Sequence, residues 1–319
     1  MELLQTSVLF LVFVLAWVFL LWRYCTHRPI LPRQNPLRRA RWSGGFVLAA
    51  FAAMFLLPGI LLGGYLIFQP VSPSKLFHPS ELGLSETSET SQTSDEPTDQ
   101  KPPELQSIHP LQVFLQENPS SWKFAWMFLF AAVLVPITEE FLFRGILQGW
   151  LDARERELYC GRRNNGWRAM LFVAFLFALM HFRMGQTGMH SETLLKYTFL
   201  MTGAAYLFIL VFGTHYLKNV CHFSSRETGW DLSHWRTDVP LGLFAFIAVA
   251  FPTFLLQNWL EKLFQNRIAP DPFALIPIAL AFGILTWRTR RLLPAIIAHV
   301  SLNSFSILSA FVQFLAKNE

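Results

Sequence analysis

Several long apolar runs dominate this sequence and restrict it to one class of protein. Many hold about 17–25 residues, the length that a helix needs to cross a hydrocarbon core of about 30 Å. The chain is 53% hydrophobic over 319 residues, with a mean hydropathy of +0.35, and is too apolar for a soluble domain of this length. The sequence therefore predicts an all-α fold, a polytopic integral membrane protein with about eight transmembrane helices.

Arginine-rich segments alternate with the apolar runs and predict the orientation. Residues 23–42 carry six arginines and no acid, and residues 152–168 and 288–291 are also basic. Short basic loops lie in the cytoplasm by the positive-inside rule. Both termini are therefore expected outside, and a bacterial inner (plasma) membrane is the expected location. The predicted spans are 6–22, 45–69, 122–150, 169–182, 194–216, 240–256, 273–287 and 292–314.

Composition divides the chain into three parts. Residues 1–69 are predicted to form two N-terminal transmembrane helices joined by a basic cytoplasmic loop. Residues 70–121 form an acidic, Ser/Thr-rich segment that is predicted to be a disordered external loop. Residues 122–319 form the membrane domain that carries the candidate site. The net charge of +5 falls in the loops between spans, and we find no nucleic-acid-binding module.

The cysteines predict neither a metal centre nor a disulfide. Cys25, Cys160 and Cys221 follow no metal-ligand or disulfide spacing. The predicted orientation places all three on the reducing, cytoplasmic side of the membrane.

Three charged residues interrupt the third apolar run. Glu139, Glu140 and Arg144 each cost about 2.5–3.5 kcal/mol at the centre of a membrane helix, so they require partners. Glu140 and Arg144 have i,i+4 spacing with the acid first, the favourable order for an ion pair, and we assign this pair a structural role. Glu139 is turned by about 100° from Glu140 and can face another helix.

Polar residues of two later spans lie at the same predicted depth as Glu139. At 1.5 Å per residue, Glu139 lies roughly 16 Å from the inner boundary, His181 roughly 20 Å, and His299 and Asn303 roughly 12 and 18 Å. Each alone could be an interhelical hydrogen-bonding residue. Their agreement in depth favours a site near the midplane of the membrane.

These residue types predict hydrolysis by activated water. Glu139 and His181 can act together as a general base. His299 and Asn303 share one helix face through their i,i+4 spacing, so their N–H groups can converge on one oxyanion. The alternative is a non-catalytic scaffold or a transporter with a polar site at the midplane, although the repeated, broken helices typical of transporters are not found.

Three motifs carry a resemblance to a known family. The sequence contains Glu139-Glu140-x-x-x-Arg144, then Phe177-x-x-x-His181, then His299-x-x-x-Asn303. In this order they resemble the signature of the CAAX protease and bacteriocin-processing (CPBP) family of intramembrane proteases, which includes the type II CAAX prenyl endopeptidases. The resemblance covers roughly residues 122–314 and excludes the first two spans.

The resemblance implies roles for the matched residues. Glu139 and His181 would activate water, His299 and Asn303 would bind the oxyanion, and Glu140, Arg144 and Phe177 would support the site. It implies a membrane-anchored protein or peptide as substrate, as in CAAX processing, although the family also includes members linked to peptide immunity. We expect glutamate-based catalysis without a cofactor, with zinc held by Glu139, His181 and His299 as the alternative. The interval between His181 and His299 is longer than in many bacterial members.

Overall fold

The structure is a computed structural model of the whole chain. It describes residues 2–26, 31, 42–68, 121–158, 166–181, 192–224, 226–264 and 271–318. Its longer helices are α1 (Glu2–Cys25), α2 (Gly44–Phe68), α8 (Trp167–Met180), α9 (Glu192–Asn219), α10 (Trp235–Phe264), α11 (Asp271–Thr289) and α12 (Leu293–Asn318). Another continuous helical rod comprises α5 (Ser121–Phe128), η2 (Leu129–Leu134), α6 (Val135–Glu140), η3 (Phe141–Gln148) and α7 (Gly149–Leu158).

The all-α membrane fold predicted from the sequence is confirmed. Each predicted span coincides with one helical rod, and no strand occurs in the described residues. Four helices are long and apolar enough to cross a membrane: 44–67, 124–158, 197–219 and 232–260. Four further apolar helices are shorter: 10–25, 167–180, 273–289 and 293–309.

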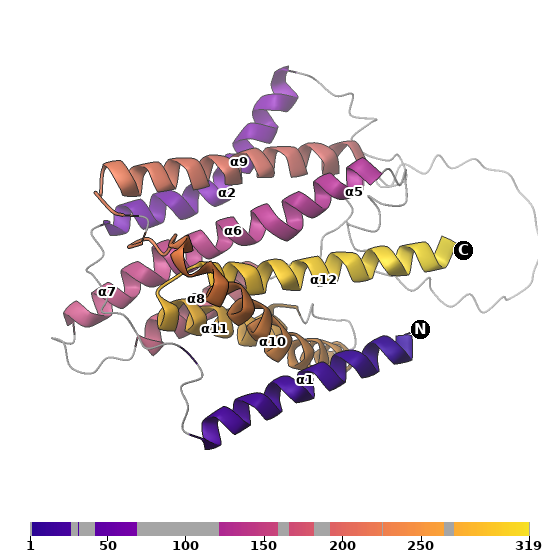
Figure 1. Cartoon of the computed structure of the whole chain (residues 1–319). Helices are drawn as coiled ribbons and strands as arrows, with labels where there is room; N and C mark the ends of the chain where they lie inside the picture. Colours follow the sequence, from indigo (N-terminus) through magenta and orange to yellow (C-terminus); the bar gives the residue numbers. More distant parts are fainter. Residues whose placement is uncertain are drawn as a thin grey trace, which may run out of the picture.

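The rod of residues 121–158 runs through the middle of the bundle (Figure 1). Its segment of Phe141, Leu142, Phe143 and Ile146 is fully buried, and α8, α9, α11 and α12 all contact the rod. The helices α2 and α9 pack together on one side, and α1 packs on α10 on the other. Of the four helices long enough to cross a membrane, the one that carries the three-charge motif is the most buried within the protein.

The central rod departs from α-helical geometry on both sides of the two glutamates. Residues of η2 and η3 form π-helical turns, with i→i+5 hydrogen bonds, and the single short α-helical segment α6 lies between them. Single π-helical turns inside α-helices occur frequently at functional sites. Pro136, in the first turn of α6, donates no backbone hydrogen bond and so contributes to the irregularity.

Several helix boundaries differ from the sequence prediction: α7 continues to Leu158 beyond the predicted end at 150, and α10 continues to Phe264 beyond 256. The helix α8 ends at Met180, so His181 lies just beyond the last turn rather than inside a span. The helix α10 begins at Trp235, whereas we predicted a loop up to residue 239 and a span beginning at Pro240. Proline favours the first turn of a helix, which made Pro240 the expected start, but Pro240 and Pro252 both lie inside α10.

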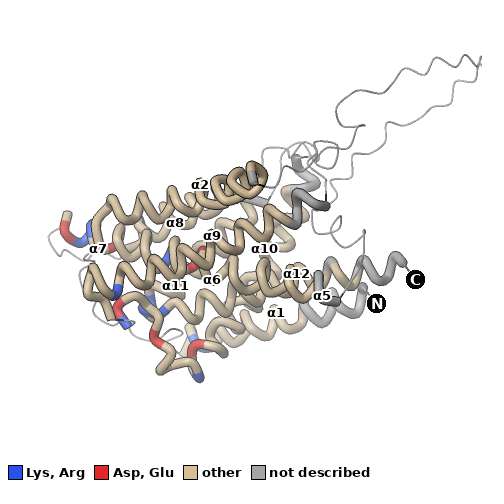
Figure 2. Tube along the Cα trace, turned by 90° about the horizontal axis from the view of Figure 1, so that it is seen from above, with Lys and Arg blue, Asp and Glu red and all other residues tan. Residues whose placement is uncertain are grey.

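Charged residues gather at one end of the bundle (Figure 2). This end contains α7 and the turn between α11 and α12, and the chain ends labelled N and C lie at the other end. Two termini at the same end agree with an even number of crossings, while the side of the membrane that each end faces stays a prediction. The acidic segment 70–120 and Cys160 lie outside the described residues, whereas Cys25 and Cys221 are free thiols.

Candidate active site

Glu139 faces two histidines from different helices. One of its carboxylate oxygens lies 3.8 Å from Nε2 of His181, and the other lies 3.7 Å from Nε2 of His299. Both separations exceed hydrogen-bonding distance. The Oε2 atom of Glu139 is buried and has no hydrogen-bond partner among the described residues. The structure thus brings together three of the four residues predicted to be catalytic, and it keeps the carboxylate close to both rings without bonding it to either.

The end of α8 fixes the ring of His181. The Nδ1 atom of His181 lies 2.8 Å from the carbonyl oxygen of Phe177, which can only accept, so Nδ1 carries the proton in this contact. The other ring nitrogen, Nε2, is the one that faces Glu139. The His181 side chain is 34% exposed, against 6% for His299, so His181 is the more accessible of the two histidines.

Glu140 holds His299, a contact that the sequence did not predict. The Nδ1 atom of His299 lies 3.0 Å from Oε1 of Glu140, and the other oxygen of Glu140 lies 3.5 Å from Nε of Arg144. Since an ionised carboxylate only accepts, His299 donates through Nδ1 and turns Nε2 toward Glu139. The Glu140–Arg144 pair exists as predicted, but Glu140 also orients a candidate catalytic ring. Nothing in the i,i+4 spacing indicated this second contact.

Arg144 is buried, and beside Glu140 it contacts a backbone carbonyl and aromatic rings. Its Nη2 donates to the carbonyl oxygen of Ala279 at 3.1 Å, and its guanidinium carbon lies 4.5 Å from the centre of the Phe177 ring. The same Phe177 ring also contacts His299 edge-on, with centroids 5.8 Å apart. Phe177 therefore packs against both the cation and the imidazole, and this placement suits the supporting role expected for it.

Asn303 is placed differently from the other predicted residues. Its side-chain Nδ2 donates to the carbonyl oxygen of Ala131 in the π-helical segment η2, at 3.1 Å. An amide nitrogen carries two hydrogens, so this bond uses one of them and leaves the other. Asn303 thus joins α12 to the central rod, a structural contact that the i,i+4 spacing with His299 did not predict.

The zinc alternative, with Glu139, His181 and His299 as ligands, stays open. No group of three or more His, Cys, Asp or Glu side chains among the described residues is arranged to hold a metal ion. Glu139, His181 and His299, the three residues named for zinc, do lie together. Whether cleavage activity depends on a metal is therefore tested by treating the protein with a chelator.

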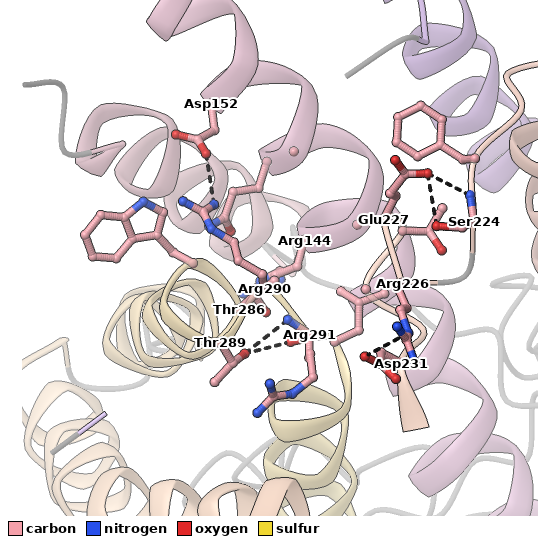
Figure 3. A pocket seen from close by; sticks show the side chains of 18 of the residues that line it. Arg144, Asp152, Ser224, Arg226, Glu227, Asp231, Thr286, Thr289, Arg290 and Arg291 are labelled. Carbon is pink, nitrogen blue, oxygen red and sulfur yellow. Dashed lines mark hydrogen bonds and ion pairs between the residues drawn. The ribbon is translucent and has the colours of Figure 1, made fainter. Parts of the chain in front are cut away.

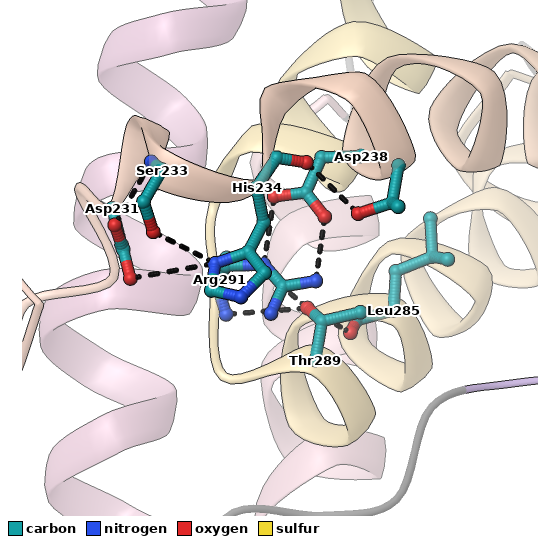
Figure 4. A network of polar contacts seen from close by, with 8 residues as sticks. Asp231, Ser233, His234, Asp238, Leu285, Thr289 and Arg291 are labelled. Carbon is teal, nitrogen blue, oxygen red and sulfur yellow. Dashed lines mark hydrogen bonds and ion pairs between the residues drawn. The ribbon is translucent and has the colours of Figure 1, made fainter.

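A second polar cluster, outside the predicted site, ties the charged end of the bundle together (Figure 4). Arg291 donates to both oxygens of Asp238, at 2.7 and 2.6 Å, and Asp238 is fully buried in the first turn of α10. The hydroxyl of Thr289 bonds the backbone of Leu285 and of Arg291. The predicted spans leave Asp238 in the loop between residues 216 and 240, and no spacing signal links residues 53 positions apart.

Gly229 fastens the neighbouring loop to this cluster. It accepts a hydrogen bond from the backbone N–H of Leu292 at 2.9 Å and has φ +83°, in the left-handed region that favours glycine. A Cβ at this position would lie 3.0 Å from the Leu292 side chain. The loop before α10 is therefore held against the turn before α12.

Comparison with protein families gives one match. A family model described as type II CAAX prenyl endopeptidase Rce1-like matches residues 121–305, which is more than half of the 319-residue chain. The matched range includes all seven residues named for the site. Comparison with curated proteins and with solved structures gives no match.

Proposed function

This chain belongs to the Rce1-like type II CAAX prenyl endopeptidase family, and we propose that it is an intramembrane endopeptidase that cleaves membrane-anchored proteins or peptides. The observation that carries the proposal is the position of Glu139 between the Nε2 atoms of His181 and His299, in a bundle of apolar helices. A carboxylate next to two imidazoles, enclosed by protein, is suited to moving protons to and from a water molecule.

In the proposed reaction, Glu139 and His181 together activate a water molecule. Atoms 3.7–3.8 Å apart can both contact the same water, so Glu139 can take its proton while His181 fixes its position. The water oxygen attacks the carbonyl carbon of the scissile peptide bond, and the carbonyl oxygen becomes an oxyanion. The proton on Glu139 then passes to the leaving amine nitrogen as the C–N bond breaks.

His299 and Asn303 stabilise the oxyanion in this scheme. The scheme has His299 protonated at both ring nitrogens, with Nδ1–H donating to Glu140. The Nε2–H is then a charge-assisted donor to the developing oxyanion. Asn303 contributes the amide hydrogen that is not used by Ala131. In this scheme Glu140 is a positioning residue that acts through His299.

The substrate class follows from the family and from the depth of the site. Rce1-like endopeptidases are named for prenylated CAAX substrates, and a prenyl or other lipid anchor would deliver a peptide bond into the membrane. We therefore propose a substrate with a lipid or helical anchor near the cleaved bond.

Cleavage of a panel of membrane-anchored peptides by the purified protein tests the proposal. The panel should include prenylated, acylated and transmembrane peptides, each compared between wild type and Glu139→Gln. Cleavage by wild type alone is the expected result. Equal products from both proteins would overturn the assignment of Glu139, and an uncleaved panel would overturn the proposed substrate class.

Chelation decides between metal-free and zinc-dependent catalysis. We expect cleavage to survive exhaustive treatment with a chelator, because Glu139 and His181 suffice to activate water. Activity that is lost to the chelator and recovered with zinc would reject the metal-free mechanism, and would reassign Glu139, His181 and His299 as ligands.

A further inference from the structure

A cavity of about 460 Å³ opens at the charged end of the bundle. Its walls come from α7, from the loop before α10 and from the turn between α11 and α12 (Figure 3). Arg144 reaches it, but Glu139, His181, His299 and Asn303 do not line it. Its volume falls within the range of pockets that bind small molecules. The cavity is therefore a separate feature from the proposed active site.

Buried polar atoms without partners gather in the wall of this cavity; two are acceptors, in Gln148 and Asp152, and the others are donors. Nη1 of Arg144, Nε and Nη2 of Arg290, and the hydroxyl of Thr286 are buried and make no hydrogen bond to any described residue. Arg144 is only 2% exposed. Figure 3 shows these three residues close to one another in the centre of the wall. Buried donors of this kind require an acceptor, because an unsatisfied buried polar group is costly.

Four arginines and three acids line the cavity (Arg144, Arg226, Arg290 and Arg291; Asp152, Glu227 and Asp231), and the arginines nearest the donors share their carboxylate partners with other cations. Asp152 accepts from Arg290 at 3.0 Å but is also paired with Arg156 at 3.6 Å, so two guanidinium groups share one carboxylate. Burial lowers the pKa of Arg290, and the charge of Asp152 counteracts this effect. Arg144 shares its partner Glu140 with His299. An additional anion would stabilise both Arg144 and Arg290.

The lining also includes apolar groups. The side chains of Trp42, Phe223 and Leu292 also line the cavity. Guanidinium groups present planar pairs of N–H donors that match the oxygens of carboxylates and phosphates. The geometry points to a binding site for an oxyanion, a carboxylate or a phosphate, carried by a partly apolar molecule. Such a group could belong to the carboxyl end of a short peptide or to the headgroup of an anionic lipid.

Equilibrium binding to the full-length protein in neutral detergent tests this site. The probes are inorganic phosphate, an apolar tripeptide with a free C-terminal carboxylate, the same tripeptide amidated, and phosphatidylglycerol against phosphatidylcholine in nanodiscs. Titration calorimetry at constant ionic strength gives the dissociation constants. Selective binding of the free-acid tripeptide would identify a peptide source, and displacement of phosphate by phosphatidylglycerol would identify a lipid source.

Two variants at neighbouring positions provide the decisive comparison. Arg290→Gln removes a lining cation, and Asp152 keeps Arg156 as a partner. Arg288→Gln removes the same charge from an exposed residue that does not line the cavity. Losing a charge-assisted hydrogen bond should weaken binding about ten- to hundredfold in Arg290→Gln, and Arg288→Gln should bind like wild type.

Thr286→Val keeps the test decisive if Arg290→Gln does not fold. This nearly isosteric change removes only the hydroxyl and should weaken binding about two- to tenfold. The proposal is overturned if none of the anions binds, because water alone would then satisfy the donors. It is also overturned if both arginine variants lose binding equally, because the anions would then bind to surface charge and not in the cavity. Because binding is measured without cleavage, this result is independent of the proposed function.

Discussion

The two polar clusters of this protein hold their charges in opposite ways. At the charged end, Arg291 donates two hydrogen bonds, of 2.6 and 2.7 Å, to the two carboxylate oxygens of Asp238. In the middle of the bundle, Glu139 lies 3.7–3.8 Å from two histidines and is bonded to neither. A short bidentate pair commits both oxygens of Asp238 and two N–H donors of Arg291 to each other, and so it serves the fold. A carboxylate held near its partners without bonding to them keeps its lone pairs for a substrate or a water.

The largest effect that separates the two clusters is expected at Glu139. Glu139→Gln keeps the shape of the side chain but removes the base, and should lower kcat by about 10²–10⁴-fold with an unchanged yield of folded protein. Rates of peptide cleavage in detergent provide the measurement. Glu157→Gln, an exposed change on the same rod, is the matched control and should keep full activity. Normal turnover in Glu139→Gln would show that the carboxylate of Glu139 does not act as the base.

Arg291→Gln tests whether the Arg291–Asp238 pair stabilises the fold. It leaves Asp238 buried without its partner, which should cost about 3–5 kcal/mol of unfolding free energy. Denaturation of the solubilised protein by increasing amounts of a denaturing detergent measures this loss. Replacing both partners, Arg291→Met with Asp238→Leu, should restore much of the stability, because no unpaired charge remains. If the folded fraction of Arg291→Gln retains wild-type kcat, the cluster acts on the fold alone.

Asn303 combines a structural contact with a proposed catalytic one, since it already donates one hydrogen bond, to the carbonyl oxygen of Ala131. If its second hydrogen binds the oxyanion, Asn303→Ala should lower kcat by about 10²–10³-fold with little change in KM. Comparing kcat and KM with the thermal midpoint separates this role from the bond to Ala131. A lowered midpoint with unchanged kcat would assign Asn303 to the fold.

Asp231 should give the smallest effect. Its carboxylate accepts from the backbone N–H of Ser233 at 3.0 Å and caps the turn before α10, so Asp231→Ala should cost about 1 kcal/mol (Figure 4). Hydrogen bonds from the hydroxyl and backbone of Ser233 lower the pKa of Asp231. A lowered folded-state pKa contributes stability above the unfolded-state pKa, and this stability is lost as pH falls through the folded-state value.

Unfolding free energies measured from neutral to acidic pH check this linkage. The neutral cap in Asp231→Asn should be less stable than wild type at neutral pH, and the difference should vanish at low pH. A difference that persists at low pH would show that the charge of Asp231 is not its source.

The sequence predicted the architecture better than the contacts of the site. Apolar run length is sufficient to predict helices, and the similar predicted depths of Glu139, His181 and His299 indicated that they lie close together. Hydrogen bonds between distant helices depend on rotation and on which oxygen faces which ring. The Glu140–His299 and Arg291–Asp238 contacts therefore required the structure. The end of α8 just before His181 also depends on packing rather than on hydropathy.

The π-helical turns of the central rod have a consequence for the rotational phase of the whole chain. A turn with i→i+5 bonds contains one residue more than an α-helical turn, so η3 sets the angle between the glutamates of α6 and everything that follows. In an unbroken α-helix each residue turns the chain by about 100°, so one residue more or fewer would misalign α7 with the glutamates. The wide turns of η3 take up the additional residue, and Gln148 at its end donates to the carbonyl oxygen of Gly283 at 3.1 Å. The segment η3 therefore allows Glu140 to face α12 and Gln148 to face α11 from the same rod.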